Sequence, residues 1–159
     1  MQLDTQLPTH LEAVTCLDSL VSRFQDSAPL EETVIKTATL GIAKSVQVRD
    51  YALGSIGLTL DPADSVTFIK ALEVLGEASP ALLAIKSAYL YELDDSIGAN
   101  LALNKALSLD PTHSLSLLLR RVFSASWPIG SLKAMREELH PKVVEGLVSL
   151  ATVRVGEGE

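Results

Sequence analysis

The sequence contains few of the residues from which catalytic and metal sites are built. Among its 159 residues are one cysteine, Cys16, and three histidines. One cysteine cannot form an intrachain disulfide or, alone, a structural zinc site. His10, His113 and His140 lie far apart, and none has a second ligand at the spacing of a metal site. We therefore predict no metal and no cofactor, and we expect Cys16 to be a core residue.

Aromatic residues and long apolar runs are also scarce. Aromatics make up 4% of the chain, and the apolar residues are mainly Leu, Ala, Val and Ile, which favours packed helices around the core of one domain. The longest uncharged runs, such as Tyr51–Leu60, reach about half of the roughly 18 residues of a membrane span. The N-terminus lacks the basic start and apolar run of a secretory signal. We expect a soluble cytoplasmic protein.

Basic residues are too few for a general affinity for nucleic acid or for a membrane. The formal net charge is −7, and both anionic surfaces are bound mainly through Lys and Arg. Residues 119–159 alone carry a small positive balance, with six basic and five acidic side chains. This zone includes Arg120, Arg121, Lys133 and Arg136. Because Glu137 and Glu138 lie within it, we interpret it as a solvated helix face rather than an anion site.

Apolar residues recur at three- and four-residue intervals along nearly the whole chain, which is typical of amphipathic helices. Thr9 and Glu12 form a capping-box pattern, and Ser79 precedes a proline that suits the first turn of a helix. Asp61 or Asp64 can cap another helix. The predicted helices are 9–24, 30–45, 46–60, 62–76, 80–93, 95–109, 112–124 and 131–139.

Short connections between these helices predict an all-α fold of seven or eight short helices, stacked as antiparallel hairpins. The expected division is a tail over 1–8, a helical domain over 9–140 and a C-terminal segment over 141–159. His140 and Pro141 are expected to end the last helix of the domain. The segment after them is predicted to be helical or extended, with a frayed Gly-Glu-Gly-Glu end.

The element over 46–60 contains two glycines that disfavour a helix. Gly54 and Gly57 each cost on the order of 1 kcal/mol relative to alanine in a helix interior. Close approach of a neighbouring helix would offset this cost, and the alternative is a strand over Ile56–Leu60. The stretch does not match a phosphate-binding loop, because it has neither the spacing nor the Lys-Ser/Thr ending.

Residues 80–113 resemble one tetratricopeptide unit, a helix–turn–helix of about 34 residues. The match lies mostly in its second helix, where Ala99, Leu103, Ala106 and Pro111 follow the small, large, small and proline pattern. Alanines at this spacing allow a neighbouring helix to come close. We therefore predict that this second helix packs in the core and that the first helix presents a partner surface.

The predicted partner groove lies on that first helix and the turn after it. Its residues are Leu83, Ala84, Ala88, Tyr91, Glu92 and Asp94. Tyr89 and Tyr91 lie about 200° apart on a helix, so at most one should face the interior. We predict Tyr91 to be an exposed hot spot, with the two acids as a rim, and Trp127 to be a plug beneath the last helices.

A second resemblance covers more of the chain. It is carried by the Val-Arg-Asp step in Val46–Leu53, by a Leu-Leu-Ala helix ending in Ala-Tyr-Leu within residues 81–119, and by the break near Trp127. These pieces look like the C-terminal half of the actinobacterial domain-of-unknown-function family 4192. Two features depart from that family: the acidic turn lacks its usual glycine, and its N-terminal half has no counterpart. The resemblance implies a truncated or separately encoded helical half and no assigned activity.

Two functions follow from these patterns. The first is a non-enzymatic module that binds a protein or peptide partner, or another copy of itself, without nucleic acid, membrane or metal. The alternative is a small-ligand-binding or enzymatic domain built from Arg49, Asp50, Asp94 and His113. For the adjacent Arg49 and Asp50, we expect each to pair with another element, because neighbours in a helix point to different faces.

Overall fold

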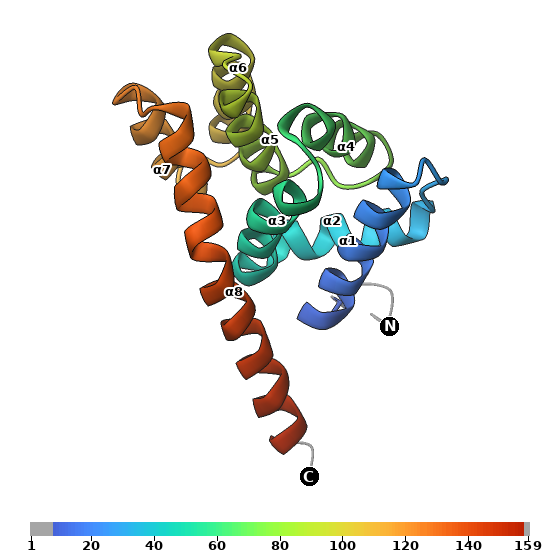
Figure 1. The fold of residues 1–159 in the computed structure, drawn as a ribbon. Helices are drawn as coiled ribbons and strands as arrows, with labels where there is room; N and C mark the ends of the chain where they lie inside the picture. Colours follow the sequence, from blue (N-terminus) through green and yellow to red (C-terminus); the bar gives the residue numbers. More distant parts are fainter. Residues whose placement is uncertain (1–7, 158–159) are drawn as a thin grey trace.

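The computed structural model describes residues 8–157, with side chains described through residue 149, and this part of the chain is all-α. The described residues form eight helices and no strand, which confirms the predicted all-α class (Figure 1). This also rules out the alternative of a strand over Ile56–Leu60. The helices are α1 (His10–Gln25), α2 (Glu32–Lys44), α3 (Val46–Thr59), α4 (Pro62–Leu75), α5 (Pro80–Glu92), α6 (Ser96–Leu109), α7 (Ser114–Ser124) and α8 (Ile129–Glu157).

The predicted starts of α1, α4 and α5 are confirmed by their capping contacts. The Thr9 hydroxyl accepts a hydrogen bond from the Glu12 amide at 3.0 Å, while the Glu12 carboxylate accepts one from the Thr9 amide at 2.8 Å. Asp61, rather than Asp64, caps α4, and Ser79 caps α5. These side chains satisfy amides that have no partner within the helix, so the local sequence is enough to define where these three helices begin.

The predicted break at His140 and Pro141 is wrong, because α8 continues through it to Glu157. Proline removes one backbone hydrogen bond and costs a helix interior about 3 kcal/mol. Buried side chains on both sides of the proline, Leu132 and Leu147, offset that cost by packing against the bundle. Gly156 and Glu157, expected to fray, belong to α8. The expected tail, apart from Pro8, and the last two residues lie outside the described residues.

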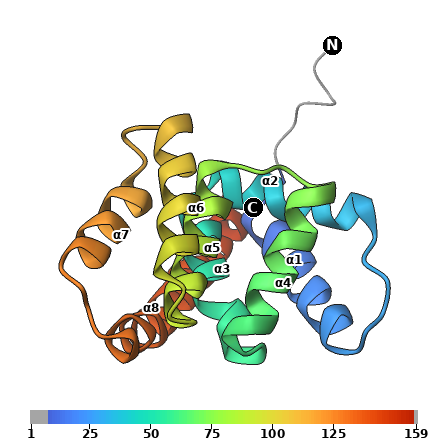
Figure 2. The same ribbon diagram turned by 90° about the horizontal axis from the view of Figure 1, so that it is seen from above.

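Helix α5 lies at the centre of the bundle and is buried along almost its whole length. It packs against α6 and α4 and also contacts α2, α7 and α8 (Figure 2). Ala99, Leu103 and Ala106 of α6 are fully buried, so the prediction that this helix packs in the core is confirmed. The last helix, α8, has C-terminal turns that extend beyond the other helices (Figure 1).

Candidate functional site

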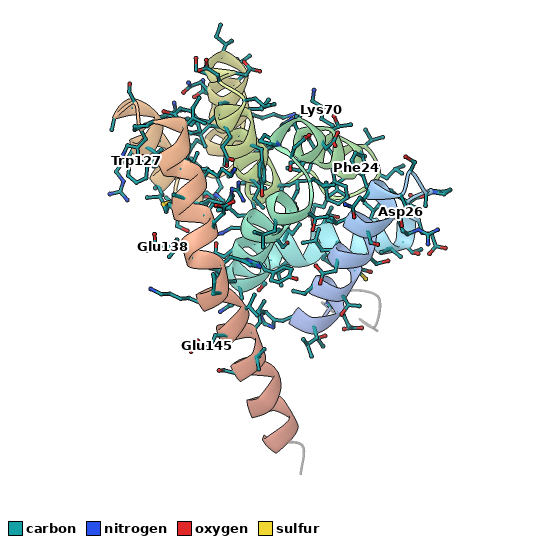
Figure 3. All side chains as sticks on the ribbon, viewed as in Figure 1. Phe24, Asp26, Lys70, Trp127, Glu138 and Glu145 are labelled. Carbon is teal, nitrogen blue, oxygen red and sulfur yellow. The ribbon has the colours of Figure 1, made fainter. Side chains whose placement is uncertain are left out.

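A groove of about 670 Å³ opens between α3, α7 and α8, and we name it the α7–α8 groove. It exists because α7 packs on α5 and α6, whereas α8 packs mainly on α3. The residues lining it are Val46, Gln47, Arg49, Asp50, Leu53, Gly54, Ser114, Leu115, Leu118, Arg121, Met135, Arg136, Leu139, His140, Lys142, Val143 and Gly146. Figure 3 shows all described side chains on this framework.

The lining of the groove is largely apolar. Leu53 and Met135 are partly buried, and Leu115 is buried beside them. Leu118 on α7 and Leu139 on α8 are 37% and 47% exposed, so they keep large apolar surfaces in water. Apolar surface lost from water stabilises a complex by about 25 cal/mol per Å². This arrangement favours an occupant that has apolar side chains of its own.

Half of the polar residues that line the groove are arginine or lysine. Arg49, Arg121, Arg136 and Lys142 line it, and Asp50 is the one carboxylate among the lining residues. This concentration of cations is unusual in a chain whose net charge is −7. The zone that the sequence suggested to be a solvated helix face therefore contributes two of its arginines, Arg121 and Arg136, to a cavity.

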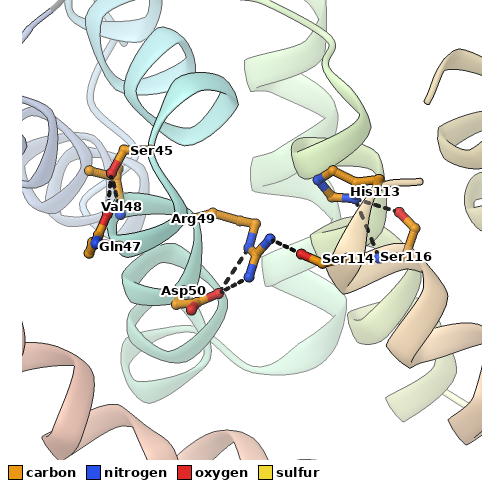
Figure 4. Close-up of polar contacts among 8 residues, drawn as sticks. All are labelled: Ser45, Gln47, Val48, Arg49, Asp50, His113, Ser114 and Ser116. Carbon is orange, nitrogen blue, oxygen red and sulfur yellow. Dashed lines mark hydrogen bonds and ion pairs between the residues drawn. The ribbon is translucent and has the colours of Figure 1, made fainter. Parts of the chain in front are cut away.

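Arg49 and Asp50 pair with each other at the edge of the groove (Figure 4). Nε and Nη2 of Arg49 lie 2.9 and 2.8 Å from the same Asp50 oxygen, while Nη1 donates to the Ser114 hydroxyl of α7 at 3.1 Å. The expectation that neither residue would pair with the other is wrong, because the long arginine side chain folds back along α3. Its third contact links α3 to the start of α7.

His113 caps α7, which places it beside this cluster. Its Nδ1 accepts a hydrogen bond from the Ser116 amide at 3.3 Å and contacts the Ser116 hydroxyl at 2.8 Å (Figure 4). Burial lowers the pKa of His113, and the positive charge of Arg49 lowers it further. A neutral imidazole is the form that can accept the capping bond at Nδ1. His113 thus acts as a helix cap here.

Arg136 forms a buried ion pair beneath the groove. Its Nε and Nη2 donate to the two carboxylate oxygens of Glu92, each at 2.9 Å, and both side chains are at least 98% buried. The guanidinium also lies 4.9 Å from the centre of the Tyr89 ring. Burial by itself lowers the pKa of Arg136, but hydrogen bonding to Glu92, together with electrostatic attraction to Tyr89, Glu92 and Glu137, outweighs burial and raises the pKa. Arg136 therefore anchors α8 to α5.

Both glycines of α3 lie where α8 makes close contact. A Cβ atom on Gly54 would come within 2.5 Å of His140 Nδ1, and one on Gly57 within 2.5 Å of Arg136 Nη1 and 2.8 Å of the Tyr89 ring. The predicted explanation, close approach of another helix, is confirmed. The Tyr89 hydroxyl completes this junction by accepting a bond from the Gly57 amide at 2.9 Å and donating one to the Leu53 carbonyl.

His140 connects the groove to α1. Its ring lies 5.2 Å from that of Tyr51, whose hydroxyl is 2.9 Å from both oxygens of Asp18. The His140 Nδ1 atom is buried and has no hydrogen-bond partner among the described residues. Burial lowers the pKa of His140, while the Asp18 carboxylate opposes this and Arg136 adds to it. The imidazole is thus held toward its neutral form.

Acidification through about pH 6.5 is expected to lower the free energy of unfolding. Because the pKa values of His140 and His113 are lowered in the folded state, the unfolded chain binds these protons more readily. Urea unfolding at several pH values between about 7.5 and about 5 should therefore show a falling stability, and His140→Gln should reduce its slope. Equal slopes for the two proteins would contradict the role of His140. Burial raises the pKa of Asp18, so its protonation at lower pH favours the folded state and opposes the effect of the histidines on stability.

The predicted partner groove on α5 is not an open surface. Leu83, Ala84 and Ala88 are buried, so the prediction of an exposed face is wrong for all three. Tyr91 is only 9% exposed. Glu92 is held by Arg136, as described above. The physical reason is that α5 is the central helix and contacts α2, α3, α4, α6, α7 and α8, which leaves no open face along it.

Tyr91 is an internal contact rather than an exposed hot spot. Its ring stacks on Phe123 with 4.5 Å between the ring centres, and its hydroxyl donates to the Trp127 carbonyl at 2.6 Å. Tyr89 is also buried, so the expectation that at most one of the two tyrosines faces the interior is wrong. Trp127 is 37% exposed and does not plug the last helices.

The alternative site of Arg49, Asp50, Asp94 and His113 is not assembled. The first two line the α7–α8 groove, and His113 lies beside them. Asp94 instead lies with Tyr91 and Trp127 in a separate hollow. Its backbone has a φ of 62°, the left-handed conformation of a tight turn after α5. Aspartate tolerates that conformation better than most residues, which gives Asp94 a turn-forming role.

Sequence reasoning missed the residues of α7 and α8 that complete the groove. Leu118, Leu139 and Lys142 were not singled out, and Arg121 was assigned to a solvated face. The available signal was the change in charge after residue 118, together with leucines on either side of the Trp127 turn. Periodicity alone could not show that these residues face one another.

Fold and site together define an all-α protein whose described residues form eight helices and an apolar groove bordered by cations. No protein-family model, curated protein or solved structure matches the chain. Within the described residues, no cluster of three His, Cys, Asp or Glu side chains could hold a metal ion. In the same part of the chain, no helix is both long and apolar enough to cross a membrane.

Proposed function

We propose that this chain is a non-enzymatic interaction module that binds a segment of a partner protein in the α7–α8 groove. The observation that carries this proposal is the groove itself, in which exposed leucines from two helices face a common apolar floor. Its volume lies within the range of about 300–1,000 Å³ typical of ligand-binding clefts. The resemblances to a tetratricopeptide hairpin and to family 4192, and the cytoplasmic location, stay predictions.

Rigid walls support a binding role for this groove. Helix α8 is fixed to α5 by the buried Arg136–Glu92 pair, and α7 is linked to α3 by Arg49. Walls held in this way do not have to be ordered when the partner binds, so less of the interaction energy is lost to conformational entropy. The partner surface is therefore proposed on α3, α7 and α8, in place of the face of α5.

A defined peptide tests this proposal. We would use a fluorescent peptide of about 14 residues with leucines at positions i, i+3, i+4 and i+7 and glutamine elsewhere, the pattern of a helix that docks in a groove. We expect it to shift the NMR methyl signals of Leu115, Leu118 and Leu139. Anisotropy titrations should show that Leu118→Gln combined with Leu139→Gln weakens binding by about tenfold or more.

The matched control is Ile97→Gln combined with Leu101→Gln on the outer face of α6. These side chains are 76% and 65% exposed, and neither lines the groove. Affinity should stay at the level of the unmodified protein. Equal losses in the two double variants, or methyl shifts confined to α6, would show that the peptide adheres to exposed leucines in general and would refute the proposed groove.

A further inference from the structure

We propose that the segment bound in the α7–α8 groove is an acidic amphipathic helix, whose carboxylates pair with Arg121 and Lys142. This inference rests on the proposed function and adds the chemistry of the partner. Three features of the molecule support it: the cations of the groove that lack a partner, the secondary structure that can enter the groove, and the charge of the rest of the chain.

The charges of the groove are not all available to a ligand. Arg49 is paired with Asp50, and Arg136 is paired with Glu92. Arg121 on α7 and Lys142 on α8 have no hydrogen bond or ion pair with any described side chain, and both are exposed. Two unpaired cations thus stand on the two walls of an apolar groove. A carboxylate suits both, since arginine offers a planar fork and lysine a compact charge.

A helix fits this groove better than an extended peptide. An extended segment needs partners for its backbone amides and carbonyls, which sheet edges normally supply. The described residues form no strand, and the uncharged polar lining is confined to Gln47, Ser114 and the His140 imidazole. A helix satisfies its own backbone hydrogen bonds, so it can bury an apolar face between α7 and α8 without leaving polar groups unpaired.

The charge of the rest of the chain argues against nucleic acid or a membrane surface as the ligand of the groove. Nucleic-acid affinity depends on neutralising many phosphates, and anionic membranes attract clusters of about 4–8 basic residues. Here two unpaired cations lie within a concave site, and residues 1–118 are predominantly acidic. Salt screens the electrostatic field of these acidic residues over a Debye length of about 8–10 Å. A short segment placed against Arg121 and Lys142 therefore interacts mainly with these two cations.

The test uses three peptides with the same leucine pattern and with Glu, Gln or Lys at the flanking positions. We expect the Glu peptide to bind the full chain about tenfold more tightly than the Gln peptide, and the Lys peptide more weakly than either. Arg121→Glu combined with Lys142→Glu should reverse this order. Raising the salt concentration from about 50 mM to about 500 mM should reduce the preference for the Glu peptide.

The matched control is Lys105→Glu combined with Lys133→Glu, which changes the net charge equally at exposed positions outside the groove. It should keep the preference for the Glu peptide. If the Gln peptide binds in the groove and the Glu peptide binds no more tightly, the acidic partner is refuted while the proposed function stands. If no peptide shifts the groove methyl signals, both fail. Competition by single-stranded DNA or by vesicles containing phosphatidylserine would also refute the acidic helix.

Discussion

An Arg136→Met variant is expected to unfold with a free energy about 3–5 kcal/mol lower than that of the unmodified protein, because it leaves a buried carboxylate without its counter-charge. Glu92 is 99% buried at its side chain, and both of its oxygens accept hydrogen bonds from Arg136. Methionine has a similar length but donates no hydrogen bond. Urea denaturation followed by circular dichroism measures the loss.

A double variant that also changes Glu92 separates the effect of lost packing from the effect of a buried, unpaired charge. Glu92→Leu combined with Arg136→Met removes both charges, so it should recover most of the stability lost in the single variant. Lys36→Met is the comparison at the surface: Lys36 and Glu32 are 63% and 57% exposed, and the change should stay within about 0.5 kcal/mol. A double variant as unstable as Arg136→Met would show that loss of the Glu92 charge pair is not the cause.

Gly57→Ala is expected to destabilise the protein by about 1–3 kcal/mol, although alanine is the better helix former. The added methyl group would meet Arg136 Nη1 at 2.5 Å and the Tyr89 ring at 2.8 Å. Neither neighbour can move freely, since Arg136 is held by Glu92 and the Tyr89 hydroxyl is bonded to α3 at two places. Thermal or urea unfolding gives the size of the change.

Gly146→Ala is the matched control for this overpacking. Gly146 also lies within a helix, α8, but a Cβ atom there would meet nothing within 4 Å. The substitution should therefore stabilise the protein by about 0.5–1 kcal/mol through helix propensity alone. The two glycine-to-alanine substitutions should thus change the free energy of unfolding in opposite directions. A stabilising Gly57→Ala would mean that α8 does not pack against α3 as described.

The candidate site was only partly predictable, and Tyr91 shows why. On an isolated hairpin its side chain would lie on an open face, and the spacing from Tyr89 supported that interpretation. In the folded chain, Phe123 stacks on its ring and the Trp127 carbonyl accepts a hydrogen bond from its hydroxyl. Both contacts come from residues more than 30 positions away, and helical periodicity carries no information about such pairs.

The sequence by itself determined the all-α class, the eight helices, and most of their ends, because capping contacts and apolar periodicity act within one or two turns. It also indicated that Gly54 and Gly57 need a close neighbour. The tertiary structure alone decided what that neighbour is, that α8 continues through Pro141, and that a groove forms beside it. These outcomes depend on contacts between residues far apart in the sequence, such as Arg136 with Glu92, 44 residues apart, and on the burial of Leu132 and Leu147 on α8. Capping and periodicity carry no information about such contacts, because they act within one or two turns.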